Sequence, residues 1–240
     1  MNSKSEIEFL EGPHSRIKEF IFVIRTMVDL VRGFRGLHFV GPCITFFGSA
    51  RFSQDHPHYQ FARKAASVFA KLGFTIMTGG GPGLMEAANR GAKDVAGRSV
   101  GCNISLSREQ KPNIYLDRWV NMNHFFTRKV LLVKYSFAFV VLPGGYGTLD
   151  ECFEALTLIQ TRKIHDFPVI IFGKEFHKNL LSHIAEMREN GTISEADLNL
   201  FLITDDISQA EEFIKLHSIK KFGLQKVKKL RPFSWLFERQ

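Results

Sequence analysis

The amino-acid sequence predicts an α/β fold with a doubly wound, mostly parallel sheet flanked by helices. Two observations lead to this prediction. Apolar runs typical of buried strands alternate with amphipathic helical segments along the chain, and two of these runs end in glycine-rich loops that turn into helices. Such alternation is typical of parallel sheets, whose strands are joined by helical crossovers.

The predicted elements follow each other through most of the chain. An amphipathic helix over residues 13–35 comes first, with Gly33 and Gly36 marking its end, and it precedes the first strand as an extra N-terminal helix. The run at 137–142 is continuously apolar, as expected of a central parallel strand. The other predicted strands are 44–47, 74–77, 100–104, 119–122, 169–172 and 201–203, and the other helices are 59–72, 84–92, 127–133, 148–161, 176–188 and one from 208.

The chain of 240 residues contains no repeat, low-complexity stretch or linker, so we expect one Rossmann-like nucleotide-binding domain over 1–240. Residues 1–42 form its helical extension, 43–217 its core and 218–240 a basic, aromatic C-terminal tail. Eight basic residues and one acid in 215–240 carry +7 of the net charge of +8. The tail either docks on the domain or a partner subunit, or binds nucleic acid or a membrane surface. Because no nucleic-acid recognition motif accompanies the charge, we do not expect a nucleic-acid partner.

Composition excludes several classes of protein. No apolar stretch reaches the roughly 18 residues of a membrane span, and the chain does not start like a signal peptide. Three cysteines without paired spacing predict free thiols and a cytoplasmic location. His56 and His58 lie two residues apart, but no carboxylate or thiolate cluster completes a metal site there. We expect no metal and no cofactor.

The most informative segment follows the apolar run at 137–142. Residues 143–151 read Pro-Gly-Gly-Tyr-Gly-Thr-Leu-Asp-Glu. Glycines let backbone N–H groups approach an anion closely, and the following helix adds its positive N-terminal end. The segment therefore predicts a phosphate-binding loop, although acidic residues in a first helical turn are also explained by capping alone.

Another glycine loop lies earlier in the chain, where it also follows a predicted strand, and it is the first of the two in chain order. Residues 78–86 read Thr-Gly-Gly-Gly-Pro-Gly-Leu-Met-Glu, and Pro82 suits the first position of the next helix. Ligands of open parallel sheets bind at the carboxyl ends of the strands, so we expect one crevice lined by both loops.

The loops exclude the commonest nucleotide chemistries. Neither has the Gly-x-Gly-x-x-Gly spacing and downstream acid of dinucleotide enzymes, and neither ends in the Gly-Lys-Ser/Thr of nucleoside triphosphatases. Two short loops better suit a smaller anion such as a nucleoside monophosphate.

Four segments together resemble the LONELY GUY (LOG) family of cytokinin riboside 5′-monophosphate phosphoribohydrolases, long mislabelled as possible lysine decarboxylases. Residues 127–129 read Thr-Arg-Lys, and 143–151 complete the specific pattern Pro-Gly-Gly-x-Gly-Thr-x-x-Glu. Residues 47–50 and 79–85 resemble the first two loops of the family. The resemblance covers about 44–206, and the N-terminal helix and the tail lie outside it.

The resemblance implies hydrolysis of the N-glycosidic bond of an adenine nucleotide, giving free base and ribose 5-phosphate. It implies a homodimer or larger homo-oligomer, and Arg128 matches the catalytic arginine of the family. The apolar N-terminal helix adds a reason to expect assembly. No lysine lies in a recognisable pyridoxal phosphate setting, so decarboxylation has no support.

Glycosidic cleavage passes through an oxocarbenium-like centre that a nearby carboxylate can stabilise. Glu151 is the candidate for this role or for activating water, with Arg128 holding phosphate or ribose and orienting it. Glu154 either binds a ribose hydroxyl or pairs with a cation. Lys129 is expected to be structural, and Cys152 to pack its helix. The remaining substrate-binding candidates are Ser49, Gly80, Gly81, Gly144, Gly145, Gly147 and Thr148, with Met122 and Asn123 as weaker candidates for the base pocket.

A non-catalytic nucleotide or cofactor carrier on the same fold remains the alternative to an N-glycosidase. Both would keep the glycine loops, and only the enzyme needs Arg128 together with Glu151. A nucleic-acid-binding protein would rest on the tail alone. No residue is diagnostic for adenine against an N6-substituted adenine.

Overall fold

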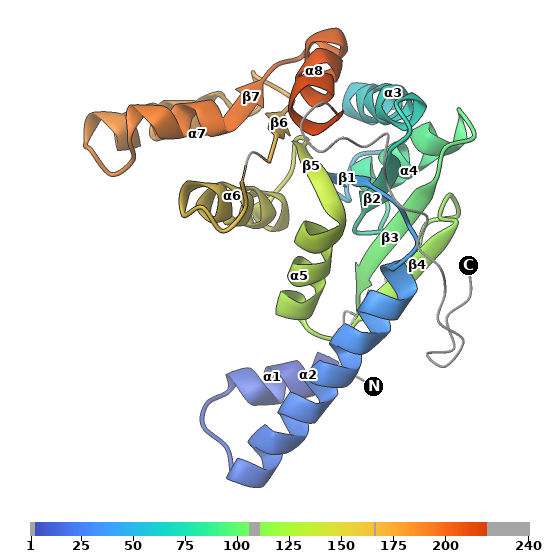
Figure 1. Cartoon of the computed structure of the whole chain (residues 1–240), viewed down its shortest axis with the longest axis vertical. Helices are drawn as coiled ribbons and strands as arrows, with labels where there is room; N and C mark the ends of the chain where they lie inside the picture. Colours follow the sequence, from blue (N-terminus) through green and yellow to red (C-terminus); the bar gives the residue numbers. More distant parts are fainter. Residues whose placement is uncertain (1–2, 106–110, 166, 220–240) are drawn as a thin grey trace.

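The computed structural model describes residues 3–105, 111–165 and 167–219. Their sheet has seven strands, all parallel, in the order β4-β3-β2-β1-β5-β6-β7. The strand order reverses between β1 and β5, so the predicted doubly wound sheet is confirmed (Figure 1). The strands are β1 Cys43–Phe47, β2 Thr75–Thr78, β3 Ser99–Ile104, β4 Arg118–Met122, β5 Ser136–Val141, β6 Val169–Ile171 and β7 Phe201–Ile203.

The helices agree with the predicted series, apart from the chain's start. They are α1 Ser3–Leu10, α2 Arg16–Leu37, α3 Pro57–Lys71, α4 Leu84–Lys93, α5 Phe125–Tyr135, α6 Tyr146–Gln160, α7 Lys178–Glu189 and α8 Ile207–Ile214, with the short helices η1 Glu195–Leu200 and η2 Lys215–Ile219. The sequence did not predict α1. Nearly all of the predicted tail, residues 220–240, lies outside the described residues.

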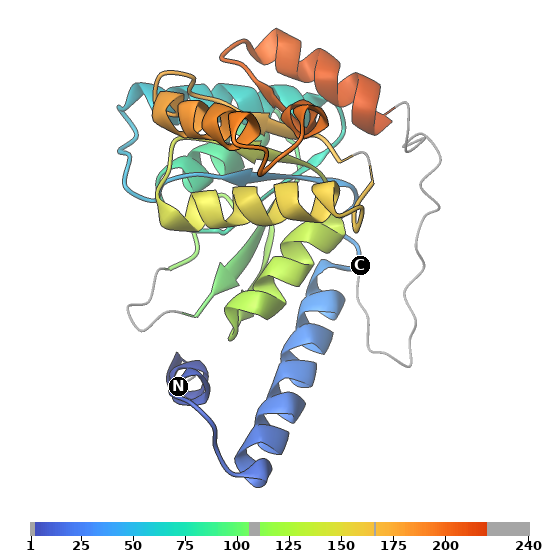
Figure 2. The ribbon, with the colours of Figure 1, turned by 90° about the vertical axis from the view of Figure 1, so that its left-hand side faces the viewer.

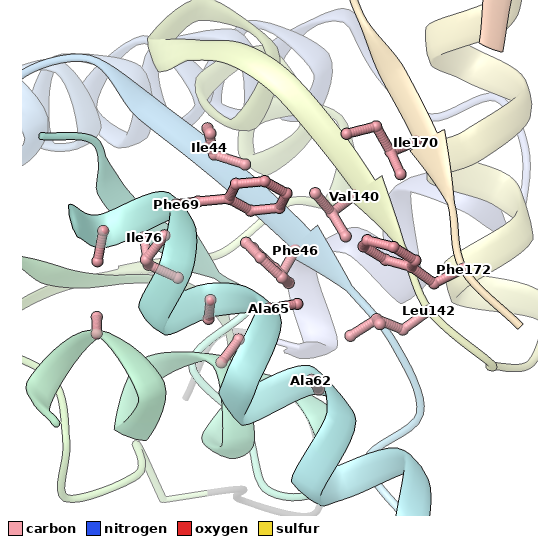
Figure 3. Packing of buried hydrophobic residues seen from close by; sticks show 14 of the residues in the cluster. Ile44, Phe46, Ala62, Ala65, Phe69, Ile76, Val140, Leu142, Ile170 and Phe172 are labelled. Atoms are coloured by element: carbon pink, nitrogen blue, oxygen red, sulfur yellow. The ribbon is translucent and has the colours of Figure 1, made fainter. Parts of the chain in front are cut away.

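The central strand β1 is buried on both faces, and its alternating side chains enter two separate cores. Ile44 and Phe46 pack with residues of α3, α4 and α8 in one core, which Figure 3 shows from close by. Cys43 and Phe47 pack in the other core with residues from α5, α6 and the end of α2. Both faces of the sheet are therefore covered by helices, as parallel sheets require.

The N-terminal helix differs from its prediction at both ends. It begins at Arg16, because the Ser15 side chain accepts a hydrogen bond from the N–H of Lys18. Gly33 and Gly36 do not end it. A Cβ on Gly33 would lie 2.3 Å from Leu131 of α5, so these glycines let the helix approach its neighbours closely.

Much of α1 and α2 extends beyond the sheet and its covering helices (Figures 1 and 2). Several apolar side chains of α2 are at least half exposed, among them Ile17 at 75% and Phe20 at 65%. Within the described residues, every helix is too short or too polar to span a bilayer.

Candidate active site

Three loops meet at the carboxyl ends of β1, β2 and β5, where the strand order reverses. The backbone of Ser49, just after β1, joins the other two. Its N–H donates to the Pro143 carbonyl at 3.1 Å, and its own carbonyl accepts from the N–H of Leu84 at 2.9 Å. Pro143 begins the loop after β5, and Leu84 begins the helix that follows the loop after β2. The two glycine loops therefore border one region, as predicted.

The loop after β5 leads directly into α6, with Gly145 as the N-cap and no side chain capping the helix. The first N–H groups of a helix have no partner within the helix, and they favour an anion. A Cβ on Gly145 or on Gly147 would meet nothing within 4 Å among the described residues. Gly144 differs, because its Cβ would lie 2.1 Å from the Thr148 hydroxyl oxygen. This loop can thus accept an oxyanion beside the buried hydroxyl of Thr148.

The loop after β2 is packed against protein instead. A Cβ on Gly79 would lie 2.6 Å from a terminal nitrogen of Arg128, and one on Gly80 would lie 1.7 Å from Asn103 Oδ1. Gly83 has a φ of +68° and lies against the backbone of Ser49. The prediction that Pro82 occupies the first helical position is wrong, because α4 begins at Leu84 with Gly83 as its N-cap.

A buried polar network holds this first loop from beneath, and the sequence did not predict it. Thr78 Oγ1 accepts from the Gly80 N–H at 2.8 Å and donates to Asn89 Oδ1 at 2.7 Å. The Asn113 amide nitrogen donates to the Gly80 carbonyl, the Gly81 carbonyl and Asn89 Oδ1, at 2.9 to 3.2 Å. The loop's carbonyls are thereby satisfied within the protein.

Arg128 and Glu151 meet across this region. Arg128 Nη1 lies 3.6 Å from Glu151 Oε1, and the Arg128 and Glu151 side chains are 14% and 4% exposed. Arg128 Nε also donates to the carbonyl of Cys102, within β3, at 2.9 Å. The guanidinium thus has three contacts within the protein. It binds the Cys102 carbonyl, packs against Gly79 of the loop after β2, and lies beside the carboxylate of Glu151.

Burial dominates the electrostatics of Glu151. It raises the pKa of this carboxyl from 4.5 to about 7, while the positive charges of Arg128 and Lys129 act in the opposite direction. The second oxygen, Oε2, is buried without a hydrogen-bond partner among the described residues. A carboxyl that titrates near neutral pH with one free oxygen is suited to proton transfer or charge stabilisation.

The neighbouring ionisable groups have other partners. Lys129 Nζ lies 2.8 Å from Asp150 and 3.3 Å from Glu154, which supports the structural role predicted for the lysine. Glu154 was expected either to bind a ribose hydroxyl or to pair with a cation, and in the structure it pairs with Lys129. Cys152 is 1% exposed, and burial raises its pKa to about 12, in agreement with a packing role.

The two candidates for the base pocket, Met122 and Asn123, both have contacts within the protein. Met122 has no exposed surface and packs in the core shared with α5 and α6. The backbone and side-chain nitrogens of Asn123 both donate to Asp29 of α2, at 2.9 and 3.0 Å. Met122 is buried and Asn123 half-buried, and the contact of either side chain with a base stays a prediction.

Asp29 is a further residue that the sequence did not single out. It is fully buried and also accepts from Thr127 Oγ1 at 2.8 Å, so the N-terminal extension fixes the start of the helix that carries Arg128. The available signal was that Asp29 is the one acid of α2 beyond its first turn.

Several known proteins are similar to this chain in sequence. The family model described as "possible lysine decarboxylase" matches residues 85–214. Cytokinin riboside 5′-monophosphate phosphoribohydrolase LOG1 of Arabidopsis thaliana is 36% identical over 38% of this chain and 44% of its own. The corresponding enzyme of Mycobacterium tuberculosis is 28% identical over 63% of this chain and 82% of its own. The chain therefore matches less than half of the length of the Arabidopsis relative.

Solved structures share the fold. The molybdenum cofactor binding protein of Rippkaea orientalis superposes with a TM-score of 0.55 at 22% identity, over 73% of this chain and 94% of its own. The molybdenum cofactor carrier protein of Chlamydomonas reinhardtii gives 0.53 at 22% identity, over 73% and 97%. At this identity the likeness concerns the fold alone. The family model, by contrast, spans more than half of the sequence, and the chain belongs to the possible lysine decarboxylase family, which is the LOG family.

Proposed function

We propose that this protein hydrolyses the N-glycosidic bond of adenine-type nucleoside 5′-monophosphates, releasing the free base and ribose 5-phosphate. The phosphoribohydrolases among its relatives support a nucleotide hydrolase. The observation that carries the proposal is the buried Arg128–Glu151 pair at 3.6 Å, placed where both glycine loops meet. A passive binding loop has no need of a carboxyl that titrates near neutral pH.

Each group has a distinct part in the proposed reaction. The N–H groups of the loop at 144–147 and the hydroxyl of Thr148 bind the 5′-phosphate, with Ser49, Gly80 and Gly81 bordering the substrate. Glu151, as a carboxylate, stabilises the positive charge that develops at the anomeric carbon, or directs the attacking water. Arg128 keeps that carboxylate in position and favours its ionised form against the effect of burial.

The proposed substrates are adenosine monophosphate, cytokinin riboside 5′-monophosphates, or both. The test is release of base from a panel of 5′-monophosphates and the corresponding nucleosides. We expect turnover of the monophosphates, with the nucleosides nearly untouched, because the glycine loop needs a phosphate to bind. Equal turnover of adenosine and its monophosphate would contradict the proposed role of the loop.

A carrier of a nucleotide-like cofactor is the second candidate, in line with the titles of the two structural neighbours. A carrier would bind its ligand through the same loops and leave every glycosidic bond intact. Monophosphate binding without release of base, at any pH between about 5 and 9, would favour the carrier.

For assembly, we propose a homodimer or a larger symmetric oligomer. Many apolar side chains of α2 are exposed, and pairing about a two-fold axis would cover them. Light scattering at micromolar concentration tests this, and a single particle of 27.4 kDa would refute it. The three free cysteines are all buried, which fits the proposed cytoplasmic location.

A further inference from the structure

Asn103 stands out among the buried polar residues at the carboxyl edge of the sheet. It lies near the end of β3 and is 6% exposed. Its amide oxygen is buried without a hydrogen-bond partner among the described residues. Buried acceptors are nearly always satisfied, and an unsatisfied one is a frequent sign of a ligand or water contact.

The first glycine loop comes unusually close to this oxygen. A Cβ on Gly80 would lie 1.7 Å from Asn103 Oδ1, and Gly80 has a φ of +74°. Gly80 N–H donates to Thr78 and its carbonyl accepts from Asn113, so the loop's own polar groups are already engaged elsewhere. The loop thus fits around the carboxamide without hydrogen-bonding to its oxygen.

Asn103 is also adjacent to the proposed reaction centre. The carbonyl of the preceding residue, Cys102, binds Arg128 Nε at 2.9 Å, and Arg128 reaches Glu151 at 3.6 Å. We propose that Asn103 Oδ1 accepts a hydrogen bond from the 2′-hydroxyl of the substrate's ribose. This rests on the proposed function and makes Asn103 a determinant of ribose specificity.

Few groups of a nucleoside monophosphate can donate a hydrogen bond to Asn103 Oδ1. Its phosphate oxygens and adenine ring nitrogens accept, so the donors that an amide oxygen can meet are the ribose hydroxyls and the exocyclic amine. Glu151 acts at the anomeric carbon in the proposed reaction, and the 2′-hydroxyl is on the adjacent carbon. Hydrogen bonds to this hydroxyl strengthen in the transition state of glycosidic cleavage. An acceptor on the residue that follows Cys102, whose carbonyl binds Arg128, is therefore best used there.

The test compares adenosine monophosphate with 2′-deoxyadenosine monophosphate, using the full-length protein and its Asn103→Ala variant. The parent should prefer the ribonucleotide. The variant should lose about tenfold or more in kcat/KM for the ribonucleotide, as expected for one hydrogen bond made to the transition state, and change little for the deoxynucleotide. Asn121→Ala is the matched control, because Asn121 is the register partner of Asn103 on β4 and is exposed. If the alanine variant fails to fold, Asn103→Leu fills a similar volume without an acceptor.

A binding measurement separates this proposal from the proposed function. Calorimetry with ribose 5-phosphate and 2-deoxyribose 5-phosphate needs no turnover, so it tests the Asn103 contact even if no base is released. The parent should bind the ribose form more tightly, and Asn103→Ala should bind both alike. Three results would overturn the proposal: equal losses for both nucleotides, unchanged preference for the ribose form, or a loss seen with adenosine monophosphate and absent with inosine monophosphate. The last would place Asn103 at the exocyclic amine of the base.

Discussion

The two glycine loops look alike in sequence and differ in what surrounds them. Both follow a buried strand and precede a helix. In the loop after β2, the missing Cβ atoms of Gly79 and Gly80 leave room for Arg128 and Asn103. In the loop after β5, the missing Cβ atoms of Gly145 and Gly147 face open space. Glycine therefore serves protein packing in the first loop, and leaves room for a ligand in the second.

This difference assigns the two loops different tasks. The first loop packs against Arg128 and Asn103, and buried hydrogen bonds hold it from beneath. In the proposed function, the second loop presents its backbone N–H groups to the phosphate of the substrate. Substitutions in the first loop should therefore act through stability, and those in the second through substrate binding.

The largest effect is expected for Gly80→Ala. Alanine would have to adopt a φ of +74° and would overlap Asn103 Oδ1. Together, the backbone strain and the overpacking should lower the free energy of unfolding by about 3 kcal/mol or more, measured by denaturant titration. Gly147→Ala is the matched control in the second loop, where the variant should be as stable as the parent and bind the monophosphate more weakly. Comparable stability losses in both variants would remove the distinction between the loops.

Glu151→Gln tests whether different residues bind the phosphate and cleave the N-glycosidic bond. The amide keeps the size of the side chain and cannot carry the charge that stabilises an oxocarbenium-like centre. We expect a loss of about a hundredfold or more in kcat, as for other single preorganised contacts. The affinity for the monophosphate, measured by calorimetry, should change far less because the second loop binds the phosphate in the proposed function. Because α6 begins at Tyr146 and has no side-chain cap, normal turnover would mean that Glu151 serves only the packing and ion pairing of this helix.

Arg128→Lys tests the contact that joins the two loops. The planar guanidinium packs on Gly79, donates to Cys102 and reaches Glu151, and an ammonium group cannot make all three contacts. We expect a loss of about tenfold or more in kcat/KM. Arg90→Lys is the control, since Arg90 bonds to Gln54 on the surface of α4 and should tolerate the change. Near-normal activity of Arg128→Lys would mean that the arginine acts through its charge alone.

The sequence predicted the sheet well because most of its strands are short apolar runs, and β1, β2 and β5 lead into segments that contain glycine. Each described strand begins and ends within about one residue of its predicted bounds. The errors lie where local signals mislead. Gly33 and Gly36 resemble a helix end, but they serve the contact of α2 with α5 and β4, which depends on tertiary packing.

The sequence predicted only those parts of the site that lie in short contiguous motifs. Arg128, Glu151 and both loops lie in contiguous motifs, and the structure brings them together. Asn89, Asn103 and Asn113 are isolated polar residues in three different segments, and only the fold places them around the first loop. Such networks carry no short-range pattern, so sequence periodicity does not reveal them.

The smallest expected effect is the pH dependence of stability that Glu151 contributes. Burial raises its pKa from 4.5 to about 7, so the folded protein binds this proton more tightly than the unfolded chain. The resulting stabilisation is complete below about pH 4.5 and is lost as the pH rises to about 7. The amide that Glu151→Gln introduces does not ionise. The melting temperature of Glu151→Gln minus that of the parent should therefore increase as the pH rises from 4.5 to about 7, and stay constant above that. In the parent, kcat/KM should rise with pH up to about 7 if the carboxylate is the active form. A melting-temperature difference that stays the same from pH 4.5 to 7 would show that burial does not set the pKa of Glu151. The contrast between the first loop, packed against protein, and the open second loop would then rest on the packing of their glycines alone.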